Sequence, residues 1–181
     1  KRQVYYALDN TKGRIFAYDF QGNMLYAFGG HGYKAGLFMN PSAIEDIGDS
    51  LLVTDQKLGT ITQFTLTDYG KMINDGLAEY KKGNYDESAN IWRKVLKHNG
   101  NYDQAYIGIG RALLREKNYK EAMDYFELKL DAKNYSKAFK LYREVWFEEN
   151  IGTILIIIAI LILLGFGVGF VKKARREVEK G

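Results

Sequence analysis

The pattern of hydrophobic and polar residues divides the chain into three zones. Up to about residue 68, apolar and polar residues alternate in short runs, which is typical of half-buried β-strands. From about residue 70 to residue 150, apolar residues recur every three or four positions, which predicts amphipathic helices. From Ile151 to Val171 no charged residue interrupts the sequence. We therefore expect a β region, then an α region, and then one long apolar helix.

The apolar stretch 151–171 has the length and composition of a membrane span. At roughly 1.5 Å per residue it gives a helix of about 31 Å, close to the hydrocarbon core of a bilayer at about 30 Å. Four cations follow it, which predicts a cytoplasmic tail 172–181 and places residues 1–150 on the other side of a cell membrane. The expected membrane-interface residues are Trp146, Phe147, Lys172, Lys173, Arg175 and Arg176.

Two features of this region have more than one interpretation. Trp146 and Phe147 suit a membrane interface, but they also suit a cap on the helices before them. Trp146 lies about one turn before Ile151, which favours the interface. Gly165 and Gly169 form a small-xxx-small pair through which two membrane helices can approach closely, although glycine is also common in membrane helices without such a contact.

Two segments of the β region repeat at an offset of 46 residues. Each has a short β-rich run that ends in an acid, Asp9 or Asp55, then a turn with glycine and a second alternating run. Between them a glycine-rich loop ends in Phe38-Met39-Asn40-Pro41. A repeat of this length with several strands suggests β-propeller blades. Asp9 and Asp55 are expected to cap their turns.

These landmarks resemble the NHL repeat over about residues 3–68, although Thr60 replaces the Arg that normally precedes the Ile of the second copy. The resemblance implies the last two blades of a propeller, in which the second blade lacks its outermost strand because the chain turns helical there. Two blades alone leave open sheet edges, so this part is expected to belong to a longer protein. The chain has no initiator Met, so a targeting segment is expected before Lys1.

The dipeptide Asn-Tyr recurs in the α region at residues 84, 101, 118 and 134, at intervals of 17, 17 and 16 residues. Twice 17 is the period of a helix–turn–helix repeat. Asn in this position caps the following helix, and Glu87, Gln104 and Glu121 would complete capping boxes. Helices are expected at about 70–82, 85–98, 102–115, 119–132 and from 135 onward.

The small and aromatic residues over about 69–136 resemble two copies of the tetratricopeptide (TPR) repeat. Gly76 and Gly110 would let paired helices approach, and Trp92 and Phe126 would fill the space between layers. Further aligned positions are Ser88, Leu96, Lys117, Ala122 and Leu130, where Lys117 departs from the usual turn glycine. Residues 137–150 would close the array with a packing stripe of Phe139, Tyr142, Val145 and Trp146.

The TPR resemblance implies a concave, weakly cationic groove suited to an acidic peptide or a C-terminal carboxylate. The residues that would form this groove are Tyr80, Lys81, Gln104, Arg111, Leu114 and Arg115. The alternative is that two repeats serve only as a spacer between the strands and the membrane.

The composition argues against several functions. The net charge of +4 owes much to the tail after Val171, so no basic face indicates nucleic acid. Cysteine is absent, which excludes disulfides and thiol chemistry. His31 and His98 have no partners at metal-ligand spacing, and no glycine-rich loop precedes a helix as phosphate binding requires. No catalytic residue, metal or cofactor is therefore predicted.

The predicted fold is multi-part, β and then α. It consists of a partial β-propeller (1–68), a TPR solenoid (69–136), a closing helix (137–150), a single transmembrane helix (151–171) and a basic tail (172–181). The combination resembles Gram-positive bacterial membrane proteins in which NHL and TPR repeats precede a Yip-family membrane domain, some of which accompany carbohydrate ABC transporters.

This resemblance implies a non-enzymatic scaffold at the cell surface, with the lipid bilayer and a protein or peptide as its partners. The alternatives are a membrane-tethered propeller enzyme of the lactonase or lyase type, and a receptor-like sensor with an output domain beyond Gly181.

Overall fold

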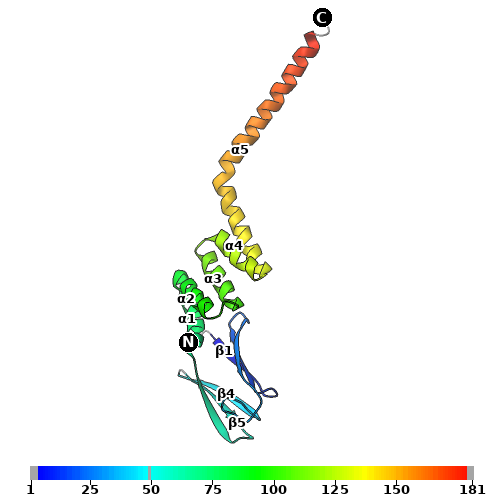
Figure 1. Ribbon diagram of the computed structural model, residues 1–181. Helices are drawn as coiled ribbons and strands as arrows, with labels where there is room; N and C mark the ends of the chain where they lie inside the picture. Colours follow the sequence, from blue (N-terminus) through cyan, green and yellow to red (C-terminus); the bar gives the residue numbers. More distant parts are fainter. Residues whose placement is uncertain (1–3, 49, 179–181) are drawn as a thin grey trace. The chain divides into compact units, whose positions relative to one another are not determined.

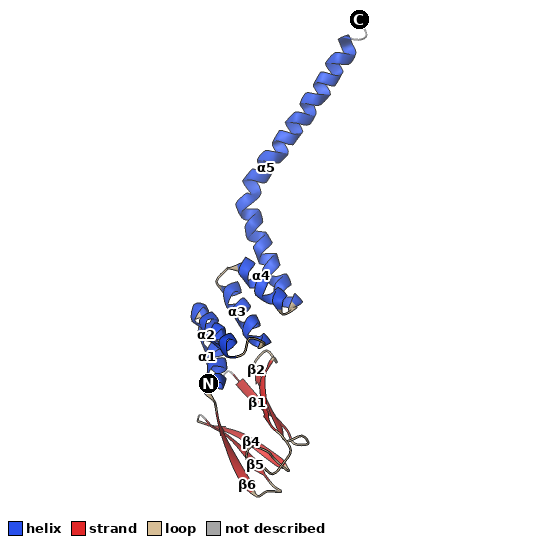
Figure 2. Cartoon of the chain, in the orientation of Figure 1, coloured by secondary structure: helices blue, strands red, loops and turns tan. Residues whose placement is uncertain are grey.

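The structure is a computed structural model that describes residues 4–48 and 50–178. Its elements follow the expected order, with strands first and helices after them (Figures 1 and 2). The chain divides into two units, Lys1–Ala138 and Phe139–Gly181, and each has its own description below.

Six strands form two separate antiparallel sheets of three strands each. The first sheet contains β1 (Val4–Asp9), β2 (Arg14–Asp19) and β3 (Met24–Gly29), and the second contains β4 (Pro41–Ile47), β5 (Ser50–Asp55) and β6 (Thr60–Thr65). In both sheets the strands are neighbours in chain order. The described strands do not close into a propeller ring but form two open sheets.

The hairpins β1–β2 and β5–β6 are related by the 46-residue offset that the sequence predicts. Gly13 and Gly59 occupy equivalent turn positions, and both have φ +63°, a left-handed conformation that favours glycine. The third strands differ, because β3 follows its hairpin whereas β4 precedes its own. In the first sheet the third strand pairs with the second strand of the hairpin, and in the second sheet it pairs with the first strand of the hairpin. A helix follows β6, at the place where a strand equivalent to β3 would come.

Asp55 joins the loop before β4 to the β5–β6 turn. Its buried carboxylate accepts hydrogen bonds from the backbone N–H groups of Met39, Asn40, Lys57 and Leu58, at 2.6, 3.1, 2.9 and 3.0 Å. Burial alone would raise the pKa of Asp55, but the four donors together hold it below its ordinary range. Asp9 accepts from the N–H of Lys12 at 2.9 Å, so the predicted turn-capping role is confirmed for both acids.

The two sheets share a small core of Ile15, Phe38, Leu51 and Val53, each at most 5% exposed. Phe38 lies at the end of the glycine-rich loop, and its ring is 5.9 Å from that of Phe64 in β6. The end of this loop therefore supplies the largest side chain of the core between the sheets.

Five helices follow: α1 (Asp68–Lys82), α2 (Tyr85–His98), α3 (Asp103–Arg115), α4 (Tyr119–Leu128) and α5 (Ala132–Val178). Each of the first three packs against the next in the chain. Helices α2, α3 and α4 begin within one residue of the starts that the Asn-Tyr spacing predicts.

Glycines set the separation of these helices, because bulky aromatic rings lie directly over them. Trp92 is 2% exposed, and a Cβ added to Gly76 would lie 2.9 Å from its ring. A Cβ added to Gly110 would lie 2.7 Å from the ring of Phe126. The predicted roles of these four residues are confirmed. The tightest approach, 2.5 Å from Trp92, is at Gly108, which the sequence analysis did not identify.

The helix starts are right, but the predicted asparagine caps are wrong. Asn84 and Asn118 are N-cap residues whose side chains make no capping hydrogen bond. Their ψ angles of 67° and 66° lie outside the extended region that places a side-chain oxygen over the first turn. Tyr102, not Asn101, precedes α3, and α5 begins after Asp131. The Asp131 carboxylate accepts from the N–H of Asn134 at 3.1 Å, which is a working N-cap.

The second repeat also ends differently from the prediction. Helix α4 stops at Leu128 rather than at residue 132, because Leu130 takes the left-handed φ of +54° that ends a helix. Leu130 is consequently 88% exposed instead of packed. Lys117 has φ +65°, in the same position of the repeat as Gly83 with φ +90°. The predicted small positions Ser88 and Ala122 are fully buried.

The second unit consists of the continuation of α5, which is helical as far as Val178. The expected stripe of the closing segment is not buried there. Phe139, Val145 and Trp146 are 44%, 37% and 43% exposed.

Candidate functional site

A cavity of about 240 Å³ lies between helices α1–α3 and the β2–β3 turn. Four of the six predicted groove residues line it: Tyr80, Lys81, Gln104 and Arg111. Of the other two, Leu114 is only 9% exposed, and the guanidinium of Arg115 donates to the Tyr80 hydroxyl at 3.2 Å.

The other wall of this cavity belongs to the chain itself. The β2–β3 turn and the strand ends beside it line this wall with Asp19, Phe20, Gln21 and Leu25. The sequence pattern did not connect this segment with the groove. The turn is held by Asp19, whose Oδ1 accepts from the backbone N–H groups of Gln21 and Asn23, both at 2.9 Å. These two bonds therefore hold the carboxylate in place within the turn.

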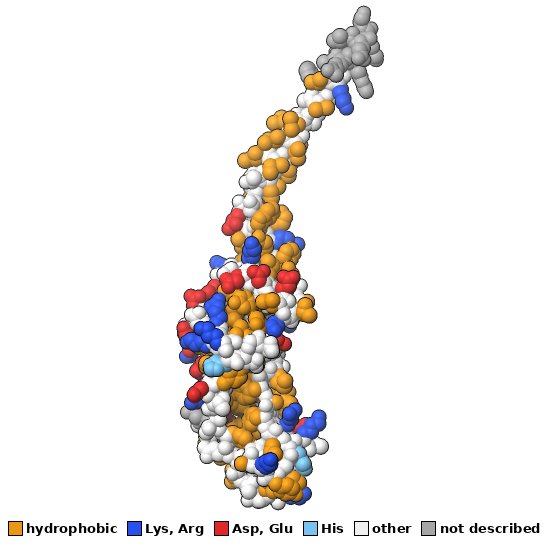
Figure 3. Space-filling view, in the orientation of Figure 1, with side chains coloured by type: hydrophobic (Ala, Val, Ile, Leu, Met, Phe, Trp, Pro, Cys, Tyr) orange, Lys and Arg blue, Asp and Glu red, His pale blue; other side chains and the backbone are white. Residues whose placement is uncertain are grey.

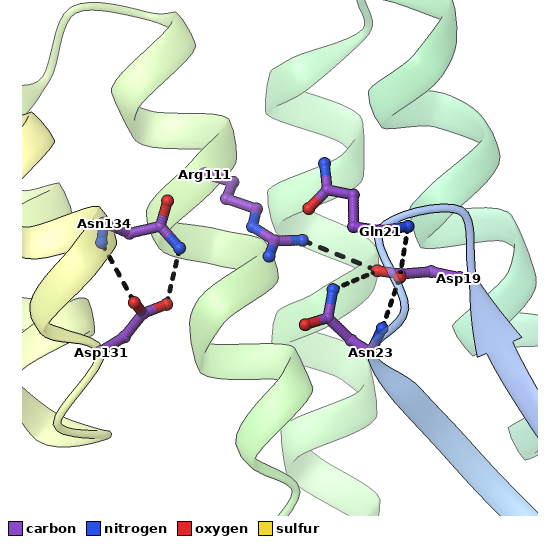
Figure 4. A network of polar contacts seen from close by, with 6 residues as sticks. All are labelled: Asp19, Gln21, Asn23, Arg111, Asp131 and Asn134. Carbon is purple, nitrogen blue, oxygen red and sulfur yellow. Dashed lines mark hydrogen bonds and ion pairs between the residues drawn. The ribbon is translucent and has the colours of Figure 1, made fainter.

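The second oxygen of Asp19 faces the helices (Figure 4). Asp19 Oδ2 accepts from the side chain of Asn23 at 2.7 Å and lies 3.7 Å from Nη1 of Arg111. The Asp19 side chain is 8% exposed and that of Arg111 18%. This ion pair between the sheet and α3 is thus largely removed from water, unlike the exposed pairs that contribute little to stability.

Two further contacts join the turn to the helices. Lys81 Nζ lies 5.7 Å from the centre of the Phe20 ring, within the range of a cation–π contact. The Tyr102 hydroxyl donates to the Leu25 carbonyl at 2.8 Å, and the Tyr102 ring stacks on Trp92. Burial, followed by the neighbouring Tyr69 and Asp19, raises the pKa of Tyr102 far above its ordinary value, so the hydroxyl keeps its proton and remains a donor.

A second cavity, of about 330 Å³, lies between the two sheets and α1. Its lining is mainly apolar and includes Tyr6, Tyr26, Phe28 and Phe64. The Tyr26 hydroxyl donates to Asn74 at 3.3 Å, and burial with the neighbouring Tyr6 raises the pKa of Tyr26. The hydroxyls of Tyr6 and Tyr26 already have hydrogen-bond partners. The rest of the lining offers hydrophobic contact, which suits packing against an apolar group.

Helix α5 provides a segment that is long and apolar enough to cross a membrane, judged by length and composition. Its hydrophobic side chains are exposed at successive positions, from Ile151 at 51% to Val171 at 55%, so the apolar surface is not confined to one side of the helix. Figure 3 shows the apolar side chains on the face in view.

The predicted membrane residues lie along this helix. Trp146 and Phe147 are 43% and 48% exposed, with ring centres 5.4 Å apart. A Cβ at Gly165 or Gly169 would meet no atom within 4 Å. Lys172 is exposed, while Lys173, Arg175 and Arg176 lie outside the part of α5 whose side chains the structure describes.

Within residues 4–48 and 50–178 no three His, Cys, Asp or Glu side chains gather as metal ligands would. The two histidines have structural neighbours. His31 forms a backbone bridge with Phe38, and the His98 ring lies 6.1 Å from that of Tyr69.

The helical layout and the glycine–aromatic contacts agree with a comparison against protein families. Residues 74–137 match the tetratricopeptide repeat family. The matched segment contains Trp92, Gly108 and Gly110, and we call helices α1–α4 the TPR pair. A search of curated proteins found no match to the chain.

The functional residues that sequence reasoning missed are those of the β2–β3 turn. One signal was present, because an aspartate precedes a glycine at all three turns, by three residues at Asp19 and by four residues at Asp9 and Asp55. Gly22 has φ +83° and closes the turn, as the other two glycines do. The pattern predicts a turn, but it does not indicate which surface the turn contacts.

Proposed function

We propose that this chain is a membrane-anchored protein-binding scaffold with its sheets and TPR pair outside the cytoplasm and its basic tail inside. The observation that carries the proposal is the TPR pair, since TPR repeats generally mediate contacts between proteins. The exposed apolar segment of α5 supports the anchoring. The proposal assigns binding rather than catalysis to the chain, with no cofactor, no metal and no nucleic-acid partner.

We further propose that the two sheets are neighbouring blades of an NHL-type propeller. The 46-residue relation between the hairpins and the equivalent turns at Asp9 and Asp55 support this. A blade needs a further strand along the free edge of β6. Amide hydrogen exchange in the full-length protein tests it, because the edge N–H groups of β6 are protected if a strand pairs there and exchange rapidly if none does.

Cysteine labelling tests the orientation, because the native chain has no cysteine. Lys97→Cys is suitable, since Lys97 is exposed on α2, whereas the small positions of the TPR pair are buried. Intact cells are treated with a membrane-impermeant maleimide. Lys97→Cys should react at once, and a cysteine at Gly181 only after lysis; the opposite result excludes the proposed orientation.

Photo-crosslinking in cells tests the binding function. A photoreactive residue at Arg115, exposed beside the groove, should capture one reproducible partner, while the same residue at exposed Lys94 on α2 should not. No product at Arg115, or the same products at both positions, contradicts the scaffold. If the captured protein is a subunit of a carbohydrate transporter, the association implied by the resemblance is supported.

A further inference from the structure

The groove of the TPR pair contains a ligand-like segment of its own chain. The β2–β3 turn presents a carboxylate to Arg111 and an aromatic ring to Lys81. We propose that this groove is a docking site for an acidic residue followed by an aromatic residue, that the chain fills it with its own Asp19 and Phe20, and that a partner peptide of the same chemistry binds by displacing the turn. The inference rests on the proposed protein-binding function.

The charges of the groove define which ligand fits it. Lys81 and Arg111 belong to α1 and α3, and the acid that pairs with Arg111 is Asp19 from outside these helices. Arg111 is largely shielded from water, so a ligand without a carboxylate would leave its guanidinium unpaired. The groove therefore selects for an anion at this point.

The turn occupies the groove only in part. Phe20 is 68% exposed, so its ring lies at the rim rather than inside. The remaining cavity of about 240 Å³ is lined by Leu77, Trp92 and Gly108 as well as by the turn. A partner whose aromatic side chain reaches this lining would bury apolar surface that Phe20 leaves exposed, and this gives a partner the means to compete.

A partner peptide must compete with the β2–β3 turn, which is covalently linked to the groove. A segment on the same chain acts at an effective concentration in the millimolar range, which an external peptide must overcome. Its apparent affinity is reduced by the fraction of molecules in which the groove is open. The turn thereby sets the threshold for binding of the partner.

The probe for the test is the turn itself, as a backbone-cyclised, fluorescein-labelled peptide of residues 18–24. Its binding to the full-length chain in detergent micelles is measured by fluorescence anisotropy. Asp19→Asn weakens the internal contact, since the amide keeps one oxygen for the turn but loses the charge that pairs with Arg111. We expect this variant to bind the peptide about tenfold more tightly than the wild type.

Three comparisons make the result specific. Adding Arg111→Gln to Asp19→Asn should abolish the gain, and a peptide with Asn in place of its Asp should not bind. Arg115→Gln is the matched control on the same helix, because Arg115 contacts Tyr80 and not the turn. In the Asp19→Asn background it should leave the gain in place. Phe20→Ala provides a second way to weaken the turn, at an exposed side chain whose loss leaves the sheet core intact.

Two results would overturn the proposal: equal binding by the wild type and both turn variants, or no binding by any of them. In the first case the turn does not block the groove, and in the second the groove does not accept this chemistry. Both are independent of the crosslinking and topology experiments in cells, so a failure of the scaffold function is recognised separately.

Discussion

Gly108 is the helical glycine with the least free space, since an added Cβ would lie 2.5 Å from Trp92 Nε1. We expect Gly108→Ala to reduce the free energy of unfolding by about 1–2 kcal/mol, because overpacking costs about 1–3 kcal/mol and the gain in helix propensity offsets up to about 1. Urea denaturation of the full chain in micelles, followed by tryptophan fluorescence, measures this. Gly100→Ala, with no neighbour nearer than 3.8 Å, is the control and should change little.

Asp55 should make the stability of the sheets depend on pH. Backbone donors lower its pKa in the folded state, against the effect of burial. Its stabilising effect is therefore present above the unfolded pKa of about 4 and is lost as the pH falls through the folded pKa. Asp55→Asn should lower the melting temperature at pH 7, and the difference from the wild type should shrink as the pH falls below about 4.

Thermal melts between pH 7 and pH 3 test this prediction. Asp9→Asn is a matched control at the equivalent turn, where the carboxylate caps its own loop through Lys12. Its effect at pH 7 should be smaller, because Asp55 joins two loops and Asp9 holds one. A constant difference between Asp55→Asn and the wild type at every pH would contradict the assigned role.

At the scale of the element, the apolar part of α5 should tolerate one charge but not two. Its Ile, Leu, Val and Phe residues together favour insertion by roughly 5–9 kcal/mol, whereas one Arg at the centre opposes it by about 2.5–3.5 kcal/mol. Leu161→Arg alone should therefore remain in the membrane pellet after alkaline extraction. Ile158→Arg combined with Leu161→Arg should shift a large part of the protein to the soluble fraction. If both variants fractionate like the wild type, α5 is not a span.

Elements defined by local patterns could be predicted, and those ended by single residues could not. The 46-residue repeat gave both hairpins, and the Asn-Tyr spacing gave the starts of α2 and α4. The end of α4 depends on Leu130 adopting a left-handed φ, which is rare for leucine and leaves no sequence signature. The caps failed for a similar reason, because backbone angles and not residue type decide whether Asn84 caps.

At the scale of the whole first unit, Tyr102 joins the helices to the sheet. Tyr102→Phe keeps the ring beside Trp92 but leaves the Leu25 carbonyl without its donor, so we expect a loss of about 1–2 kcal/mol in the free energy of unfolding. The matched control is Tyr106→Phe, whose exposed hydroxyl donates to Gly100 six residues away. That change should stay within about 0.5 kcal/mol, and equal losses for both variants would contradict the joining role.

The candidate site shows where sequence reasoning ends. The helix faces that carry Lys81 and Arg111 followed from the TPR period, so one wall of the groove was predictable. The wall formed by Asp19 and Phe20 was not, because turns have no periodic signal for the surface that they contact. Contacts between segments distant in the chain determine which surface a turn meets. In a single sequence the contact of Asp19 with Arg111 is visible only as two residues of opposite charge.

The hydrogen bond between Tyr102 and Leu25 joins residues that are 77 positions apart. At about 5–20 residues per second, synthesis of that distance takes roughly 4–15 s. A β-hairpin alone forms within about 1–10 μs, so β2 and β3 can pair long before α3 exists. During these seconds the aspartate of the turn has no arginine to meet. The time at which this sheet can dock against α3 is therefore set by the rate of translation and not by the rate of hairpin folding.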